Sequence, residues 1–237
     1  MGIKMRERYV HNDPRAARLK ILCAFAALLI AAVVIGLVVH SVREKNKVDI
    51  TELTVCIDPG HGGNDRGTEI DGRYEKDDNV RLALEVGKRL KEKGCKVIYT
   101  RKTDTYVSLE ERADFANKKR ASYFLSLHRN SAENKVSGVE AWISTTATRQ
   151  EQTIAKCILE EINKVGYGED RGVKRGYQGN PLQNYHVNAA TQMPSCLLEM
   201  GFMSTPVDNV LFDENFSEYA QAIADGIELG FLSAEDD

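Results

Sequence analysis

Three short polar groups in this sequence each follow a predicted buried strand, and they contain residue types that bind metals and move protons. The groups are Asp-Pro-Gly-His-Gly-Gly at 58–63, His-Arg-Asn at 128–130 and Glu-Met-Gly-Phe at 199–202. In open α/β sheets, ligands bind beyond the carboxyl ends of the strands, so these groups are expected to meet at one edge of a sheet. A fourth candidate, Glu75, stands at the start of a predicted helix.

His61, His128 and one carboxylate brought together would form a three-ligand catalytic zinc site. Zinc accepts imidazole nitrogen and carboxylate oxygen, and a catalytic centre keeps one position for water. The pKa of that water falls from about 15.7 to about 7, which supplies a nucleophile at neutral pH. A second carboxylate away from the metal can take the proton and pass it to a leaving amine. The chain has a candidate for each part.

Each candidate also has a simpler interpretation. A lone histidine is more often a core or surface residue, although the glycines around His61 allow a close approach of the backbone. Glu75 is also what the helix dipole favours in a first helical turn. Glu199 has the strongest argument, because a carboxylate at the end of the apolar run 196–198 is costly unless it is paired, bound or functional.

The elements that must position these residues alternate between strand and helix. Apolar runs predict strands at 53–57, 95–100, 123–127, 139–143 and 195–199. Helical periodicity predicts helices at 76–93, 108–116, 154–165 and 216–231, the second of them opened by a capping box at Ser108 and Glu111. Residues 170–194 lack a clear period and are expected to form a long functional loop region with one short strand. This alternation predicts a single α/β domain with a twisted, mostly parallel sheet flanked by helices.

A transmembrane anchor is predicted ahead of this domain. Residues 21–39 carry no charged or polar side chain, and as a helix they would span roughly the 30 Å of a bilayer core. Six basic residues precede the apolar run and three follow it, so residues 1–20 are expected in the cytoplasm. Residues 40–51 would form a linker, with a catalytic domain at 52–233 on the extracytoplasmic side of the cell membrane. A cleaved signal peptide and a buried core helix are the alternatives.

The composition excludes several classes of protein. With 42% hydrophobic and 28% charged residues among 237, the chain is neither collagen-like nor intrinsically disordered. Its net charge of −3 averages two unlike parts, because residues 1–50 carry nine Lys and Arg against four Asp and Glu. Residues 51–237 carry twenty-three against thirty-one, a net of −8, which argues against nucleic-acid binding.

Four cysteines lie outside the apolar segment, at Cys56, Cys95, Cys157 and Cys196. An even number in an exported domain permits two disulfides. All four fall in apolar or periodic stretches, so buried free thiols are the favoured interpretation. Their spacing is not that of a zinc finger.

Taken together, these residues resemble the zinc-dependent N-acetylmuramoyl-L-alanine amidases (amidase type 3) that cleave bacterial peptidoglycan. The similarity covers about residues 53–231 and rests on the order and spacing of its motifs. These are Ile-Asp-Pro-Gly-His-Gly-Gly (57–63), Glu-Lys-Asp-Asp-Asn (75–79), Tyr-Thr-Arg (99–101), Ser-Leu-His-Arg-Asn-Ser (126–131), Gly-Val-Glu-Ala-Trp (138–142), Met-Pro-Ser (193–195) and Leu-Glu-Met-Gly-Phe-Met-Ser (198–204).

By this resemblance, His61, Glu75 and His128 are the ligands of one zinc ion, and Glu199 is the catalytic general base. The implied reaction is the hydrolysis, by zinc-activated water, of the amide between the lactyl group of N-acetylmuramic acid and L-alanine of the stem peptide. It would serve cell-wall remodelling, cell-wall turnover or modification of the spore cortex, and the sequence does not distinguish these roles.

The resemblance also implies substrate contacts and partners. Arg129 and Asn130 are candidate substrate contacts, and so is His186, which stands where an aromatic residue is common in the family. Peptidoglycan and the membrane are the expected partners, whereas an activator protein cannot be read from the sequence. Two alternatives stay open. One is a non-catalytic peptidoglycan-binding or scaffold protein on this fold, and the other is a different zinc peptidase of the cell wall, although His-Glu-x-x-His is absent.

Overall fold

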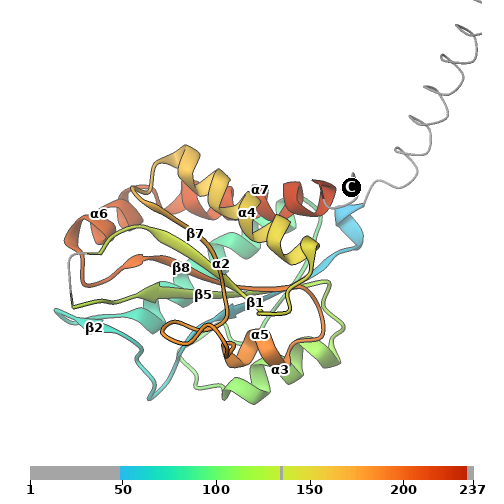
Figure 1. Cartoon of the computed structure of the whole chain (residues 1–237), viewed down its shortest axis with the longest axis horizontal. Coiled ribbons are helices and arrows are strands. Elements are labelled where there is room, and N and C mark those ends of the chain that lie inside the picture. The colour runs from blue at the N-terminus through green and yellow to red at the C-terminus, as the bar shows by residue number, and fades with distance from the viewer. Residues whose placement is uncertain (1–48, 134–135, 234–237) are drawn as a thin grey trace, which may run out of the picture. The chain divides into compact units, whose positions relative to one another are not determined.

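Six strands form the central sheet of the domain, for which a computed structural model describes residues 49–133 and 136–233 (Figure 1). The strands are β1 (Thr54–Pro59), β4 (Lys96–Tyr99), β5 (Tyr123–Asn130), β6 (Val139–Ile143), β7 (Asp170–Arg175) and β8 (Ser195–Phe202). They lie in the order β4-β1-β5-β8-β6-β7, and all neighbours are parallel except β6 and β8. The predicted α/β fold with a mostly parallel sheet is therefore confirmed.

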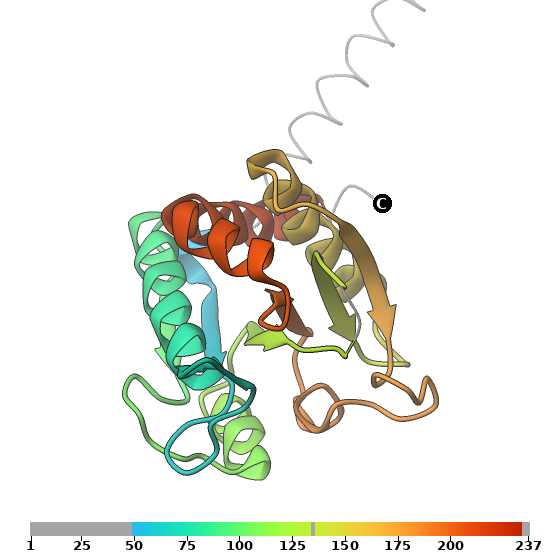
Figure 2. The same ribbon diagram turned by 90° about the vertical axis from the view of Figure 1, so that its left-hand side faces the viewer.

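Helices cover both faces of this sheet (Figures 1 and 2). The larger apolar core lies under α2 (Glu75–Glu92), α4 (Arg149–Val165) and α7 (Phe216–Ser233). A smaller apolar cluster on the other face lies under α3 (Leu109–Lys118) and α5 (His186–Ala190). The remaining elements are a single turn η1 (Ile50–Glu52), a two-stranded hairpin of β2 (Glu69–Ile70) and β3 (Arg73–Tyr74), and α6 (Pro206–Glu214).

Local sequence signals account for the ends of several helices. Ser108 and Thr148 each make both hydrogen bonds of a capping box, with Glu111 and Glu151 respectively. At the other end of α4, Gly166 adopts a left-handed conformation with φ of 98°, which suits a residue without Cβ. These caps define the ends of α3 and α4, and the capping box predicted at Ser108 is confirmed.

The two strands that carry His128 and Glu199 are longer than predicted. Strand β5 continues to Asn130 and β8 continues to Phe202, so both candidate site residues lie inside strands near their carboxyl ends. The reason is that β8 lies between β5 and β6, and backbone pairing on both sides extends past the apolar run. Helices α5 and α6 and the β2–β3 hairpin were also absent from the predicted elements, since each is too short to develop a clear period.

Two further predictions concern the cysteines and the membrane anchor. All four cysteines are free thiols, three of them buried and Cys157 half-buried, which confirms the favoured interpretation. The predicted span at 21–39 lies outside the described residues. Within the part of the chain that the structure describes, no helix has the length and apolar character needed to cross a bilayer.

Candidate active site

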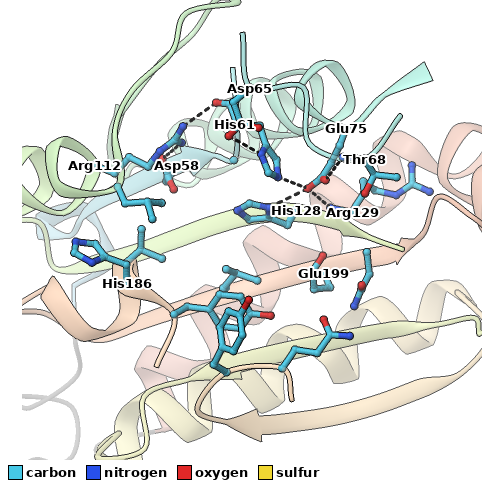
Figure 3. A pocket seen from close by; sticks show the side chains of 18 of the residues that line it. Asp58, His61, Asp65, Thr68, Glu75, Arg112, His128, Arg129, His186 and Glu199 are labelled. Carbon is cyan, nitrogen blue, oxygen red and sulfur yellow. Dashed lines mark hydrogen bonds and ion pairs between the residues drawn. The ribbon is translucent and has the colours of Figure 1, made fainter. Parts of the chain in front are cut away.

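Three side chains that can bind a metal converge where β1, β5 and α2 approach one another (Figure 3). His61 follows β1, Glu75 is the first residue of α2, and His128 lies in β5. One ligand atom from each residue lies within 4.8 Å of the other two. Both histidines contact the same carboxylate oxygen, since Oε1 of Glu75 is 3.2 Å from Nε2 of His61 and 2.9 Å from Nδ1 of His128. The structure thus brings together the three residues predicted to bind zinc.

The geometry and chemistry of this cluster fit a zinc ion. Ligand atoms about 2.1 Å from a tetrahedral zinc are roughly 3.4 Å apart, and the two distances from Glu75 to the histidines are 3.2 and 2.9 Å. Two imidazoles and one carboxylate are also a donor set of catalytic zinc sites. The surrounding backbone is closely fitted, because a Cβ atom at Gly60 would lie 2.2 Å from Cε1 of His128. A Cβ at Gly67 would lie 2.6 Å from Oε2 of Glu75, so both glycines are needed for the side chains to converge.

His61 is held in a specific orientation by its own loop. Its backbone has φ of 60°, a left-handed conformation that is unusual for a residue other than glycine. Its Nδ1 atom lies 2.9 Å from Oδ2 of Asp65, which leaves Nε2 facing Glu75. A carboxylate on the outer nitrogen is a common way of orienting a metal-binding histidine. Asp65 was not among the predicted site residues, although its position four residues after His61 was visible in the sequence.

Glu75 is buried and held on both of its oxygens. Oε2 accepts a hydrogen bond from the backbone N–H of Thr68 at 2.9 Å, and Oε1 accepts one from the N–H of Arg129 at 3.1 Å. Burial alone would favour the neutral carboxyl, but the hydrogen bonds from His128 and His61 outweigh it and hold the pKa of Glu75 well below its ordinary value. Glu75 is therefore an anion, as a metal ligand must be. Its place in the first turn of α2 agrees both with a metal ligand and with an acidic residue favoured by the helix dipole.

Glu199 lies beside the three candidate ligands on the adjacent strand. It pairs in register with His128 of β5 on one side and with Glu140 of β6 on the other. Its side chain is buried, and Oε2 has no hydrogen-bond partner among the described residues. Burial, followed by the negative charges of Glu75 and Glu140, raises the pKa of the Glu199 carboxyl well above its ordinary value. A buried carboxyl with a raised pKa and no fixed partner is suited to taking up and releasing a proton.

Glu140 has the opposite environment to its neighbour Glu199. Its oxygens accept hydrogen bonds from Asn130, Trp142, Arg171 and Lys174. Although it is buried, these donors lower the pKa of Glu140, and it stays ionised. Glu140 is thus a fixed negative charge next to the Glu199 carboxyl, which can take up a proton. The motif at 138–142 contained this residue, but nothing in its local sequence distinguished it from a surface glutamate.

Two buried arginines hold the loop that presents His61. Arg101 donates to the carbonyl oxygens of Pro59 and Gly60. Arg112 donates to the carbonyls of Pro59 and His61 and forms an ion pair with Asp58 at 2.7 Å. Consecutive carbonyl groups at 59–61 therefore all accept from guanidinium groups. These contacts stabilise the turn in which His61 adopts its unusual conformation.

Replacing Arg112 by methionine should destabilise the domain strongly. The Arg112–Asp58 pair is only 3% and 1% exposed, so the change leaves a buried carboxylate without its cation. We expect the free energy of unfolding to fall by about 3–5 kcal/mol, measured by urea denaturation. Lys118→Ala is the control, since Lys118 pairs with Asp114 on the surface and should cost at most about 1 kcal/mol. Equal losses from both variants would contradict this role for Arg112.

The predicted substrate contacts lie in different settings. The guanidinium of Arg129 is enclosed by Asp78, Asn209 and the ring of Phe212, so in this structure it connects α2 to α6. Asn130 donates to the Glu140 carboxylate. His186 begins α5 and lines the cavity apart from the metal-binding cluster (Figure 3). A substrate contact stays a prediction for all three residues. Of the three, only His186 has no side-chain hydrogen bond to the protein among the described residues.

A cavity of about 670 Å³ opens over these residues. It contains His61, Glu75, His128 and Glu199 at its base. One wall comes from the segment that leads into α3 and the other from the segment between β7 and α5. This volume is typical of a binding site for a ligand larger than a single amino acid.

Comparisons with known proteins agree with this geometry. The family model described as N-acetylmuramoyl-L-alanine amidase matches residues 55–229. The Bacillus subtilis protein YqiI is 34% identical over 178 residues, covering 74% of this chain and 83% of that relative. The probable cell wall amidase LytH of Staphylococcus aureus is 31% identical over 202 residues, covering 83% of this chain. This chain spans only 64% of the length of LytH.

Solved structures of similar fold carry related names. The N-acetylmuramoyl-L-alanine amidase from Clostridium difficile 630 is 36% identical with a TM-score of 0.66, and the match covers 78% of this chain and 97% of that one. The CwlD amidase from Clostridioides difficile, solved in complex with the GerS lipoprotein, is 27% identical with a TM-score of 0.69. That match covers 78% of this chain and 100% of CwlD.

Proposed function

Because the chain belongs to the N-acetylmuramoyl-L-alanine amidase family and is an enzyme of that class, we propose that it hydrolyses the lactyl–alanine amide of peptidoglycan at a zinc centre. In this proposal His61, Glu75 and His128 hold the zinc ion, and Glu199 is the general base. The observation that carries it is the register of the sheet, which sets Glu199 directly beside His128. A non-catalytic binding protein would need no such carboxyl next to its metal ligands.

When bound, zinc would lower the pKa of a water molecule and polarise the carbonyl group of the scissile amide. Glu199 takes a proton as the water oxygen forms its bond to the carbonyl carbon. It then returns the proton to the amide nitrogen as the C–N bond breaks. The products are a lactyl carboxylic acid on the sugar and a stem peptide with a free amino-terminal alanine.

The residues around Glu199 assist both proton transfers. Its unpartnered Oε2 atom is available to the attacking water. The fixed charge of Glu140 on the next strand makes Glu199 a stronger base, since a like charge favours the protonated form of its neighbour. Lys174 and Arg171 balance that charge from β7 and keep Glu140 from taking the proton itself.

A digestion assay tests the proposed function directly. The full chain, purified in detergent and loaded with zinc, is expected to bind about one zinc ion. Incubated with peptidoglycan, it should release peptides whose new amino terminus is alanine, detected by amino-terminal labelling. Cleavage within the peptide or between sugars, without free alanine, would instead favour another cell-wall hydrolase.

The sequence pattern supports a location for this activity. We propose that residues 21–39 anchor the chain in the cell membrane, with residues 1–20 inside and the catalytic domain outside, near the wall. Intact spheroplasts treated with protease should lose the catalytic domain while retaining a cytoplasmic amino-terminal tag. Protection of the domain from protease would contradict this orientation, and release of the untreated domain into the medium would indicate a cleaved signal peptide.

A further inference from the structure

The two walls of the active-site cavity differ in composition. We call the segment 176–187 the neutral wall and the segment 101–112 the opposite wall. No Lys, Arg, Asp or Glu occurs from residue 176 to residue 198, although 28% of the chain is charged. The opposite wall has six such residues among twelve, but of these only Arg112 lines the cavity, where it is buried and paired with Asp58. A ligand on the neutral wall therefore meets no charged side chain of that segment.

An aromatic platform stands on the neutral wall. The ring of Tyr177 lies 4.7 Å from that of Tyr185, and Tyr185 lies 5.7 Å from the buried Trp142. Tyr177 is the outermost of the three rings and is 44% exposed, while Tyr177 and Tyr185 both line the cavity. The rings behind it keep Tyr177 in place. A ligand that stacks on this ring therefore does not have to bear the entropy cost of fixing the side chain.

Amide side chains surround this platform. Gln178 and Asn184 line the cavity beside the two tyrosines. Asn184 also fastens the neutral wall to the end of β6, because it accepts from the backbone N–H of Thr145 at 2.8 Å and donates to Ser144. Exposed aromatic rings with neutral amides suit sugars, whose C–H faces stack on rings and whose hydroxyl and acetamido groups form hydrogen bonds.

One half of the substrate matches the neutral wall. On one side of the scissile amide is an N-acetylated glycan, whose lactyl carboxyl is neutral because it forms that amide. On the other side is a stem peptide that carries carboxylates and an amino group. A neutral surface accepts the glycan at low desolvation cost, whereas it offers no opposite charge to the peptide.

We propose that the neutral wall is the glycan-binding subsite, with Tyr177 as its stacking surface. This inference rests on the proposed function and adds the orientation of the substrate to it. Because Tyr177 would contact the sugar before and during the reaction alike, its loss should raise KM and leave kcat nearly unchanged.

Binding of the two substrate halves, measured separately, tests the proposal. The ligands are a peptide-free tetrasaccharide of alternating N-acetylglucosamine and N-acetylmuramic acid and a free stem tripeptide, each titrated into the zinc-loaded full chain. Tyr177→Ala should weaken binding of the tetrasaccharide about tenfold and leave binding of the tripeptide unchanged. Tyr177→Phe, which keeps the ring, should bind both ligands like the unsubstituted chain.

The matched control lies on the opposite wall, where Tyr106 is 58% exposed and also lines the cavity. Tyr106→Ala should leave tetrasaccharide binding unchanged, and zinc content should be the same in every variant. The proposal is overturned if Tyr177→Ala binds the tetrasaccharide normally or if its affinity falls for the tripeptide instead. It is also overturned if Tyr106→Ala weakens tetrasaccharide binding as much as Tyr177→Ala does. Since these outcomes concern binding, they are separate from the proposed function, which fails only if the unsubstituted chain releases no amino-terminal alanine.

Discussion

Glu199→Gln should abolish amide hydrolysis and leave the metal centre loaded. Glutamine has nearly the same shape as glutamate but cannot take a proton from water at neutral pH. We expect turnover of peptidoglycan to fall by about a thousandfold, which lies within the contribution of general acid–base catalysis. Turnover is measured as alanine amino termini released per minute, and zinc content by atomic absorption on the same sample.

Two further measurements separate a catalytic effect of this substitution from a structural one. The melting temperature of Glu199→Gln should not fall, because Oε2 of Glu199 has no hydrogen-bond partner to lose among the described residues. Glu169→Gln is the control, since Glu169 is an exposed carboxylate outside the cavity and should cleave normally. If Glu199→Gln cleaves within tenfold of the unsubstituted chain, the general base is another group.

His128→Ala should empty the metal site, with loss of turnover as a consequence. The imidazole contributes one of three ligand atoms, and its removal leaves only His61 and Glu75 in the cluster. A ligand present at about a thousand times its Kd stabilises the folded state by about 4 kcal/mol. We therefore expect a chelator to lower the melting temperature of the unsubstituted chain and to leave that of His128→Ala unaffected. His61→Ala should behave in the same way.

His186→Ala provides the matched control for the metal-site substitutions. His186 lines the same cavity but lies outside the metal-binding cluster, so zinc content and chelator sensitivity should be retained. Equal zinc content in His128→Ala and His186→Ala would remove His128 from the ligand set. Loss of zinc from His186→Ala alone would place the metal elsewhere in the cavity.

Much of the scaffold was predictable because its signals are local. Strand β8 contains the apolar run 196–198, as expected for a strand that is buried on both faces. Helix α3 begins at a capping box whose two members are three residues apart. Short elements such as α5 and α6 escaped prediction because five to nine residues are too few for a period to develop.

The contrasting roles of similar residues could not be predicted, since they depend on neighbours far away in the sequence. Glu140 and Glu199 are both buried glutamates on adjacent strands, yet only Glu140 receives the cations of β7, at Arg171 and Lys174. Arg129 follows the candidate metal ligand His128 in the sequence, which suggested a substrate contact. Its guanidinium is instead enclosed beside Asp78, fifty-one positions earlier in the chain.

Residue types and their spacing were enough to predict the candidate site of this protein: two histidines, two glutamates and the strands that carry them to one edge of a mostly parallel sheet. They could do so because strand and helix patterns are local and the topology of such sheets is restricted. The charge states and the surroundings of the site depended on the tertiary structure. Pairing of Glu199 with His128 and Glu140, the arginines behind His61 and the neutral wall all arise from distant segments, whose contacts no local pattern encodes.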